Sequence, residues 1–154
     1  MNTWNEAIPF FSKDELACKG TGIVKLNREF AAMLPALRRA WGKPLTPNSV
    51  CRTPEYNRQI NNGEGGHPHS LHLTENPKHP IEGTAAADIR WRGWKEEDQL
   101  KFARLAYSLG FAVGLHDGFC HVDWRQGAGL PQLCFLYGTW TGGFSTKDVI
   151  VCTD

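Results

Sequence analysis

The sequence lacks the segments that direct a protein out of the cytoplasm or into a membrane. Its 154 residues contain no N-terminal run that joins basic residues, an apolar core and a small-residue cleavage site. No stretch approaches the roughly 20 apolar residues that are needed to span a bilayer. We therefore expect synthesis in the cytoplasm without a signal peptide, and no membrane insertion.

The sequence also has little net charge. A formal net charge of +1 provides no broad basic field for the phosphates of DNA or RNA. Nucleic acid is therefore not an expected partner.

Paired cysteine motifs are absent as well. The five cysteines are an odd number and form no Cys-x-x-Cys pair: Cys18, Cys51, Cys120, Cys134 and Cys152. This pattern favours reduced thiols over a disulfide framework or a zinc finger.

What is present is enough for one packed domain over residues 1–154. The apolar fraction is 41%, there are six tryptophans, and no repeat, low-complexity tract or linker divides the chain. Apolar residues at helical spacing predict helices over residues 25–41 and 96–109. Pro35 is expected to kink or divide the first of these.

Shorter segments complete a prediction of an α+β fold, with a small antiparallel sheet and helices packed on one side. A short helix is expected after Ser12, and another after Pro54 with Thr53 as its cap. Expected strands cover residues 48–52, 85–89, 111–115, 119–124 and 133–137, with a weak one at 149–151. Turns between the 111–115, 119–124 and 133–137 runs predict that these three strands are antiparallel.

Two imidazoles and a carboxylate from separate segments suggest a metal site. They are His72, Asp88 and His121. Imidazole and carboxylate suit a borderline cation such as zinc, and three protein ligands leave a fourth position open for water. An open position indicates catalysis.

An iron oxygenase site also uses two histidines and a carboxylate, commonly as His-x-Asp followed by a distant second histidine. His121-Val122-Asp123 matches the first part, but every other histidine precedes it. Cys120 is next to His121 and could also bind zinc. Adjacent side chains on a strand point to opposite faces, so we expect Cys120 in the core and His121 in the site.

The ordered motifs resemble the zinc D-alanyl-D-alanine carboxypeptidase family, whose fold is shared with phage peptidoglycan endopeptidases and the Hedgehog signalling domain. The resemblance covers residues 11–125 and leaves 126–154 as a C-terminal extension of unassigned role. Its motifs are residues 49–57, Gly65-Gly66 through Ser70-Leu71-His72, Gly83 through Asp88-Ile89, Gly110-Phe111, and residues 119–123.

The resemblance implies that His72, Asp88 and His121 bind Zn²⁺ and that Arg52 pairs with a substrate carboxylate. A guanidinium matches a carboxylate with two parallel hydrogen bonds, although a salt bridge between Arg52 and Glu55 is an ordinary alternative. Ser70 and His69 are expected to contact substrate, as is His67 at the rim.

The chain departs from the family pattern at two places. Residues 73–87 separate His72 from Asp88, where the family has a short turn; this insertion contains His79, an alternative ligand that lacks the Ser-x-His context. Its residues 73–83 are polar and are expected to form a lid or a substrate wall.

The second departure is that no acid lies just upstream of His121, so the general base is unassigned. The candidates are Asp117 and Asp123, with His116 close by. Asp123 shares a strand face with His121 and is equally suited to orient a metal ligand.

The expected function is zinc-dependent hydrolysis of peptide bonds in bacterial peptidoglycan. An enzyme made without a signal peptide would act on the cell wall after release, as a phage lysis enzyme does. The alternative is a phage virion component or wall-binding module that keeps the fold without turnover. A Hedgehog-like signalling ligand is not supported, since no export segment is present.

Overall fold

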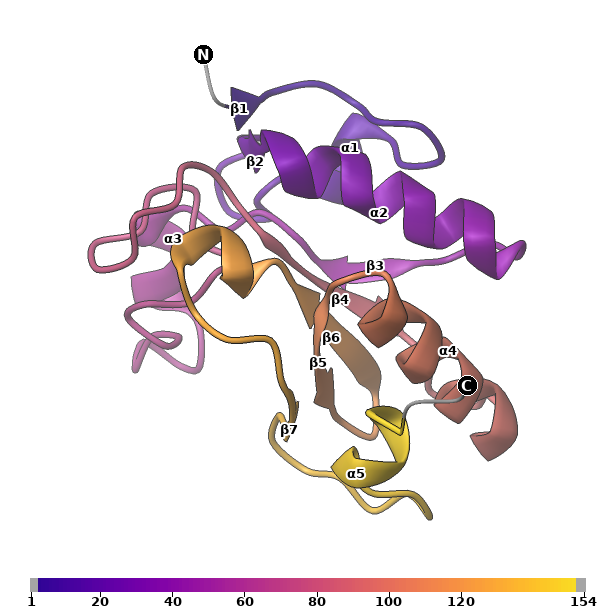
Figure 1. Cartoon of the computed structure of the whole chain (residues 1–154). Helices are drawn as coiled ribbons and strands as arrows, with labels where there is room; N and C mark the ends of the chain where they lie inside the picture. Colours follow the sequence, from indigo (N-terminus) through magenta and orange to yellow (C-terminus); the bar gives the residue numbers. More distant parts are fainter. Residues whose placement is uncertain (1–2, 152–154) are drawn as a thin grey trace.

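A five-stranded sheet forms the centre of the fold (Figure 1), with its strands in the order β3-β4-β6-β5-β7. The computed structural model describes residues 3–151. The strands are β3 (Pro47–Ser49), β4 (Ala86–Arg90), β5 (Ala112–Leu115), β6 (Phe119–Asp123) and β7 (Cys134–Leu136). Together with the helices this sheet confirms the predicted α+β class.

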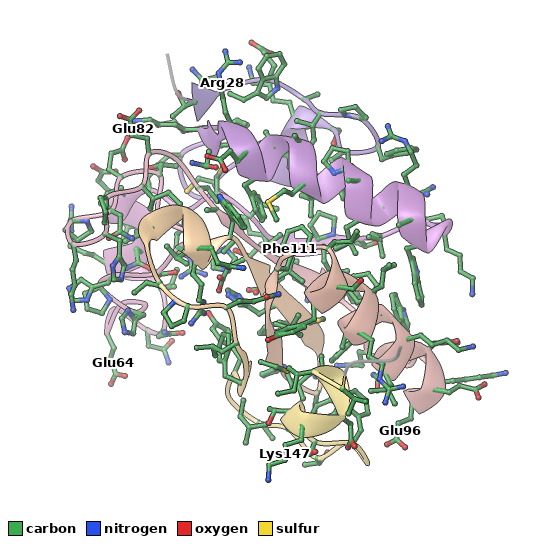
Figure 2. The ribbon with its side chains drawn as sticks, in the orientation of Figure 1. Arg28, Glu64, Glu82, Glu96, Phe111 and Lys147 are labelled. Carbon is green, nitrogen blue, oxygen red and sulfur yellow. The ribbon has the colours of Figure 1, made fainter. Side chains whose placement is uncertain are left out.

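Helices α2 (Arg28–Trp41) and α4 (Glu96–Ser108) pack against one face of this sheet. Their apolar residues and those of the sheet form one buried cluster, and Phe111, which is 0% exposed, belongs to it. Figure 2 shows the labelled Phe111 in the interior, while charged side chains such as Glu64 and Glu96 lie at the periphery. Within residues 3–151, no helix is both long and apolar enough to cross a membrane.

The two faces of the sheet differ because side chains alternate along each strand. Cys120 and Val122 of β6 belong to the apolar cluster beneath the helices. His121 and Asp123 therefore point to the opposite face, where β4 places Asp88 directly across from His121. The prediction that Cys120 faces the core and His121 the site is confirmed.

Helix α2 begins at Arg28 because the Asn27 side chain accepts a hydrogen bond from the Phe30 N–H at 3.0 Å. It ends at Gly42, whose φ of 78° is the left-handed conformation that glycine adopts without a Cβ clash. The helix is continuous through Pro35, which is buried against the core. Pro35 was expected to kink or divide this helix, and it does not divide it, because tertiary packing of this face outweighs one lost backbone hydrogen bond.

Short elements connect these parts of the chain. They are β1 (Thr3–Trp4), α1 (Lys13–Leu16), β2 (Leu26–Asn27), α3 (Pro54–Gln59), η1 (Arg125–Ala128) and α5 (Thr146–Val149), and β1 pairs with β2. The predicted caps at Ser12 and Thr53 are confirmed: each side chain accepts the N–H of the residue three positions later. The four cysteines in this region form no disulfide, and Cys152 lies outside the described residues.

The C-terminal part corrects two predictions. Strand β7 runs parallel to β5, because the chain leaves β6 beside the start of β5 and enters β7 from the same end. The expected strand at 149–151 is not formed: Val149 is the last residue of helix α5, whose first turn is fixed by a capping box of Ser145 and Asp148. Strand β3 also ends at Ser49, before the predicted residue 52.

Candidate metal centre

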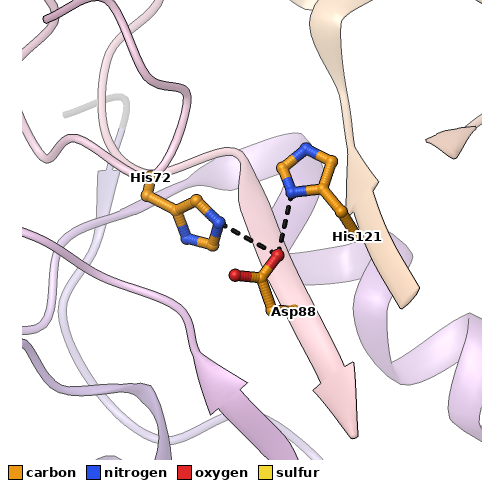
Figure 3. Close-up of side chains that lie close together, drawn as sticks. All are labelled: His72, Asp88 and His121. Carbon is orange, nitrogen blue, oxygen red and sulfur yellow. Dashed lines mark hydrogen bonds and ion pairs between the residues drawn. The ribbon is translucent and has the colours of Figure 1, made fainter. Parts of the chain in front are cut away.

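His72, Asp88 and His121 point toward one another (Figure 3), from a loop, from β4 and from β6. Their relative exposures are 0%, 6% and 4%. One ligand atom from each lies within 4.8 Å of the other two. The structure therefore brings together the three residues that the sequence singled out as metal ligands.

The spacing of the ligand atoms fits a metal ion. His72 Nε2 lies 3.3 Å and His121 Nδ1 lies 2.9 Å from the same oxygen of Asp88, Oδ1. Ligand atoms bound about 2.0–2.1 Å from a tetrahedral ion lie roughly 3.3 Å from each other. Little rearrangement would be needed to bind one.

The tautomer of His72 points to the same conclusion. Nδ1 lies 2.8 Å from the backbone oxygen of Val50, and a carbonyl oxygen only accepts, so Nδ1 carries the proton. The lone pair of buried Nε2 then faces Asp88 without a hydrogen-bond partner. Burying the His72 Nε2 lone pair against the Asp88 carboxylate, away from water, costs free energy because neither atom can donate a proton to the other. A cation bound between them removes that cost.

His121 lies between two carboxylates. Nδ1 is 2.9 Å from Asp88 and Nε2 is 2.8 Å from Asp123. Burial opposes a charge here, but hydrogen bonds to Asp123 and Asp88 outweigh it and raise the pKa of His121 to about 9. For Asp88, burial alone would raise the pKa, yet the hydrogen bond and positive charge of the His121 ring hold it well below its usual range. The two buried carboxylates around His121 therefore favour a bound cation at this site.

The main chain around His72 is held from several sides although no helix or strand contains it. The His72 N–H donates to Ser70 Oγ at 3.2 Å, and the His72 carbonyl accepts from Arg52 N–H at 2.9 Å and from Thr84 Oγ1 at 2.8 Å. Asn76 ties the insertion to this loop by donating to the carbonyls of His69 and Ser70. These contacts fix the ligand before any ion binds.

Asp123 is fully buried and its oxygens are all occupied. Oδ2 accepts from His121 Nε2 and from Arg125 Nη2, whereas Oδ1 accepts from the Arg125 N–H and Nε. A carboxylate has about four lone-pair positions, so this one has no vacancy for another donor. Burial opposes ionisation, but the bonds from His121 and Arg125 lower the pKa of Asp123. This is the arrangement of a carboxylate that orients a metal-binding histidine.

The structure places Asp117 elsewhere, in the turn between β5 and β6. Its carboxylate accepts from the Thr141 N–H at 2.7 Å and from Thr141 Oγ1 at 3.0 Å, and these bonds lower its pKa. His116, in the same turn, stacks on Phe119. Asp117 is not brought together with the three ligands, so its assignment as general base stays a prediction.

A cavity of about 270 Å³ opens beside the ligands. The insertion contributes His79 to its wall, as expected for a substrate wall, and the predicted rim residues are also there. The lining residues are His67, His69, Ser70, Leu71, His79, His121, Asp123, Arg125, Leu130, Phe135 and Tyr137. Three of them, Leu130, Phe135 and Tyr137, come from the C-terminal segment, for which the sequence offered no role.

Tyr137 was missed by the sequence reasoning. Its ring stacks on His121, with the centroids 4.4 Å apart and the planes at 11°. Burial raises the pKa of Tyr137 to about 12, so the phenol keeps its proton at neutral pH. Sequence position did not reveal this contact, because β7 reaches the site only through its pairing with β5.

Arg52 lies next to the ligand loop and is half-buried. Its Nη1 donates to Asn57 Oδ1 at 3.1 Å, and Asn57 in turn donates to the His67 carbonyl. Among residues 3–151, no carboxylate lies within ion-pair distance of the guanidinium, so the alternative pairing with Glu55 is not formed. The cation is therefore partly desolvated and available to an anionic group.

We predict that Asp123→Asn weakens metal binding by roughly 10- to 100-fold. An amide donor facing Nε2 would move the His121 proton to Nδ1, the atom that faces Asp88. Competition with a chromophoric chelator measures the affinity. Asp117→Asn is the matched control and should bind metal like the wild type; equal affinities of all three proteins would contradict the orienting role of Asp123.

Comparisons with known proteins agree with this site. A family model described as Peptidase M15 matches residues 9–123, a range that ends at Asp123 and contains all three ligands. No curated protein and no solved structure matches the chain. Peptidases of this family depend on a metal, and the buried group of two histidines and an aspartate fits one. The chain belongs to the peptidase M15 family and is a metallopeptidase-family protein.

Proposed function

We propose that this protein hydrolyses a peptide bond in the stem peptides of bacterial peptidoglycan, with zinc as its metal. The observation that carries the proposal is the buried His72, Asp88 and His121 group beside an open cavity, in a chain of this peptidase family. His72, Asp88 and His121 would hold the ion. When bound, zinc supplies Lewis-acid chemistry and lowers the pKa of water toward neutrality.

The other residues of the site have separate tasks in this proposal. Arg52 binds a carboxylate of the substrate and thereby fixes the position of the scissile bond. Asp123 keeps the proton of His121 on Nε2, so that Nδ1 stays available as a ligand. Ser70 and His69 line the cavity and contact the peptide.

The proposal also includes where the protein acts. Stem peptides lie outside the cytoplasmic membrane, so an enzyme made in the cytoplasm reaches them after release, as a phage lysis enzyme would. Phage virion proteins are the proposed partners if the protein is instead carried in a particle.

A second candidate is a virion component or wall-binding module without turnover. One observation favours it: within the part of the chain that the structure describes, Asp123 has no free lone-pair position to accept a proton, and Asp117 is not brought together with the three ligands. Asp117 is bonded to Thr141, and Asp123 to His121 and Arg125. A module of this kind would bind stem peptides and leave them intact.

One incubation separates the two candidates. The zinc-loaded protein is mixed with purified peptidoglycan and with synthetic peptides that end in D-alanyl-D-alanine, and products are followed by mass spectrometry. The peptidase should release alanine or cleaved stems, and a chelator should stop it. Bound but uncleaved peptide would identify the module, and neither binding nor cleavage would reject both.

A further inference from the structure

Part of the cavity wall comes from residues outside the family match. Residues 9–123 contain the ligands, whereas the lining residues Leu130, Phe135 and Tyr137 lie beyond them: Leu130 follows η1, Phe135 is on β7 and Tyr137 directly follows β7. The backbone N–H of Tyr137 donates to the Leu115 carbonyl at 2.9 Å, which fixes the end of β7 against β5. The placement of this wall is therefore set by backbone pairing.

Gly114 makes room for this wall. It lies across from His121 in the β5–β6 ladder and from Phe135 in the β5–β7 ladder. A Cβ there would lie 2.9 Å from Tyr137 Cβ, closer than real Cβ atoms approach, and 3.1 Å from both His121 Cβ and Phe135 Cζ, which would also have to shift slightly. The missing side chain at this one position lets Tyr137 stack directly on a metal ligand.

The Tyr137 hydroxyl is the unexplained part of the contact. Stacking on His121 needs only the ring, which phenylalanine would also supply. Half-buried Tyr137 instead carries a donor that makes no hydrogen bond with any residue from 3 to 151, on a side chain that lines the cavity. The hydroxyl oxygen is not among the enclosed unpartnered atoms of the described residues, so it is open to the cavity and free to donate to a ligand.

The charges around the phenol indicate what kind of group it meets. Its ring stacks on the ligand His121, and Asp88, Asp123, Arg52 and Arg125 all act on it electrostatically, so both the metal ligands and the proposed carboxylate-binding arginine are near it. A peptide held by Arg52 with its scissile carbonyl toward the ligands would pass this hydroxyl. A neutral donor suits an oxygen that becomes negative only during the reaction.

We propose that Tyr137 is a catalytic residue whose hydroxyl donates a hydrogen bond to the oxygen of the scissile carbonyl as negative charge develops there. The inference rests on the proposed function and deepens it, because it assigns a catalytic role to the segment beyond the matched residues. Tyr137 donates the hydrogen bond without losing its proton, and no bond to the protein forms.

Tyr137→Phe tests the role because it removes only the hydroxyl and keeps the ring on His121. We expect kcat/KM on a peptide ending in D-alanyl-D-alanine to fall about 100-fold, mainly through kcat, as when an oxyanion donor is removed. Affinity for a phosphinate analogue of that peptide, measured by calorimetry, should fall about as much, because the analogue mimics the charged tetrahedral state. Zinc affinity and affinity for the product peptide should not change.

Tyr107→Phe is the matched control, since Tyr107 lies on α4 outside the cavity lining, and it should behave as the wild type. Turnover and phosphinate affinity of Tyr137→Phe within threefold of an active wild type would overturn this inference alone. Parallel loss of zinc would also overturn it, because the hydroxyl would then act by supporting metal binding and not on the scissile carbonyl. A wild type that neither cleaves the peptide nor binds the phosphinate would overturn the proposed function as well.

Discussion

Replacing His72 by alanine is expected to remove metal binding and with it all turnover. His72 Nε2 is a buried lone pair aimed at Asp88, and no other described side chain is in place to take over as third ligand. We expect metal affinity to fall by more than the roughly 10- to 100-fold that loss of an orienting partner costs. Metal analysis of the dialysed protein, together with peptide cleavage, measures both effects.

Thermal unfolding gives an independent measure of the same site. An ion that binds only the folded chain stabilises it by about 4 kcal/mol at a concentration 1,000 times its dissociation constant. For a domain of this size that corresponds to a rise of about 10 °C in the unfolding midpoint. The wild type should show this rise on adding zinc, and His72→Ala should show none.

His79→Ala is the matched control for this experiment. His79 lies in the insertion, lines the cavity and was the sequence's alternative to His72, but it is not among the three converging residues. It should retain the metal, the thermal shift and most of the activity. Loss of metal from His79→Ala with retention by His72→Ala would overturn the ligand assignment.

The ligands were predictable because each lies in a segment with a clear local pattern. The alternation in β6 separates Cys120 from His121, and the small alanines before Asp88 indicate a buried strand. The register that pairs Asp88 with His121 was not readable. Strand pairing depends on long-range packing, which cannot be predicted from local composition.

Contacts that depend on distant pairings were not predictable. The Asp117 carboxylate bonds to Thr141, 24 positions away, so the sequence left it equivalent to Asp123 as a base. Strand β7 was located correctly but given the wrong direction, because direction depends on where the chain enters the sheet. For the same reason the stacking of Tyr137 on His121 became visible only in the structure.

Replacing Arg52 by glutamine is expected to lower kcat/KM by about 100-fold on peptides that carry a free carboxylate near the cleaved bond, the scale of a charged hydrogen-bonded contact. The half-buried guanidinium is held by Asn57 and is not neutralised by any carboxylate within ion-pair distance in residues 3–151. Arg52→Lys should recover only part of the loss in kcat/KM, because an ammonium cannot form the two parallel hydrogen bonds that a guanidinium makes with a carboxylate.

The substrate carboxylate provides the decisive comparison. Amidating it should cost the wild type about as much as the Arg52→Gln substitution does, and the two changes together should cost little more than either one, because both remove the same contact. Arg58→Gln is the matched control: Arg58 is exposed on α3, the helix that follows Arg52, and lines a different cavity, so its loss should leave kcat/KM unchanged. Additive effects of amidation and Arg52→Gln would contradict this role and would mean that Arg52 binds some other part of the substrate. The substrate carboxylate would then be bound by the histidines at the rim of the cavity, His67, His69 and His79.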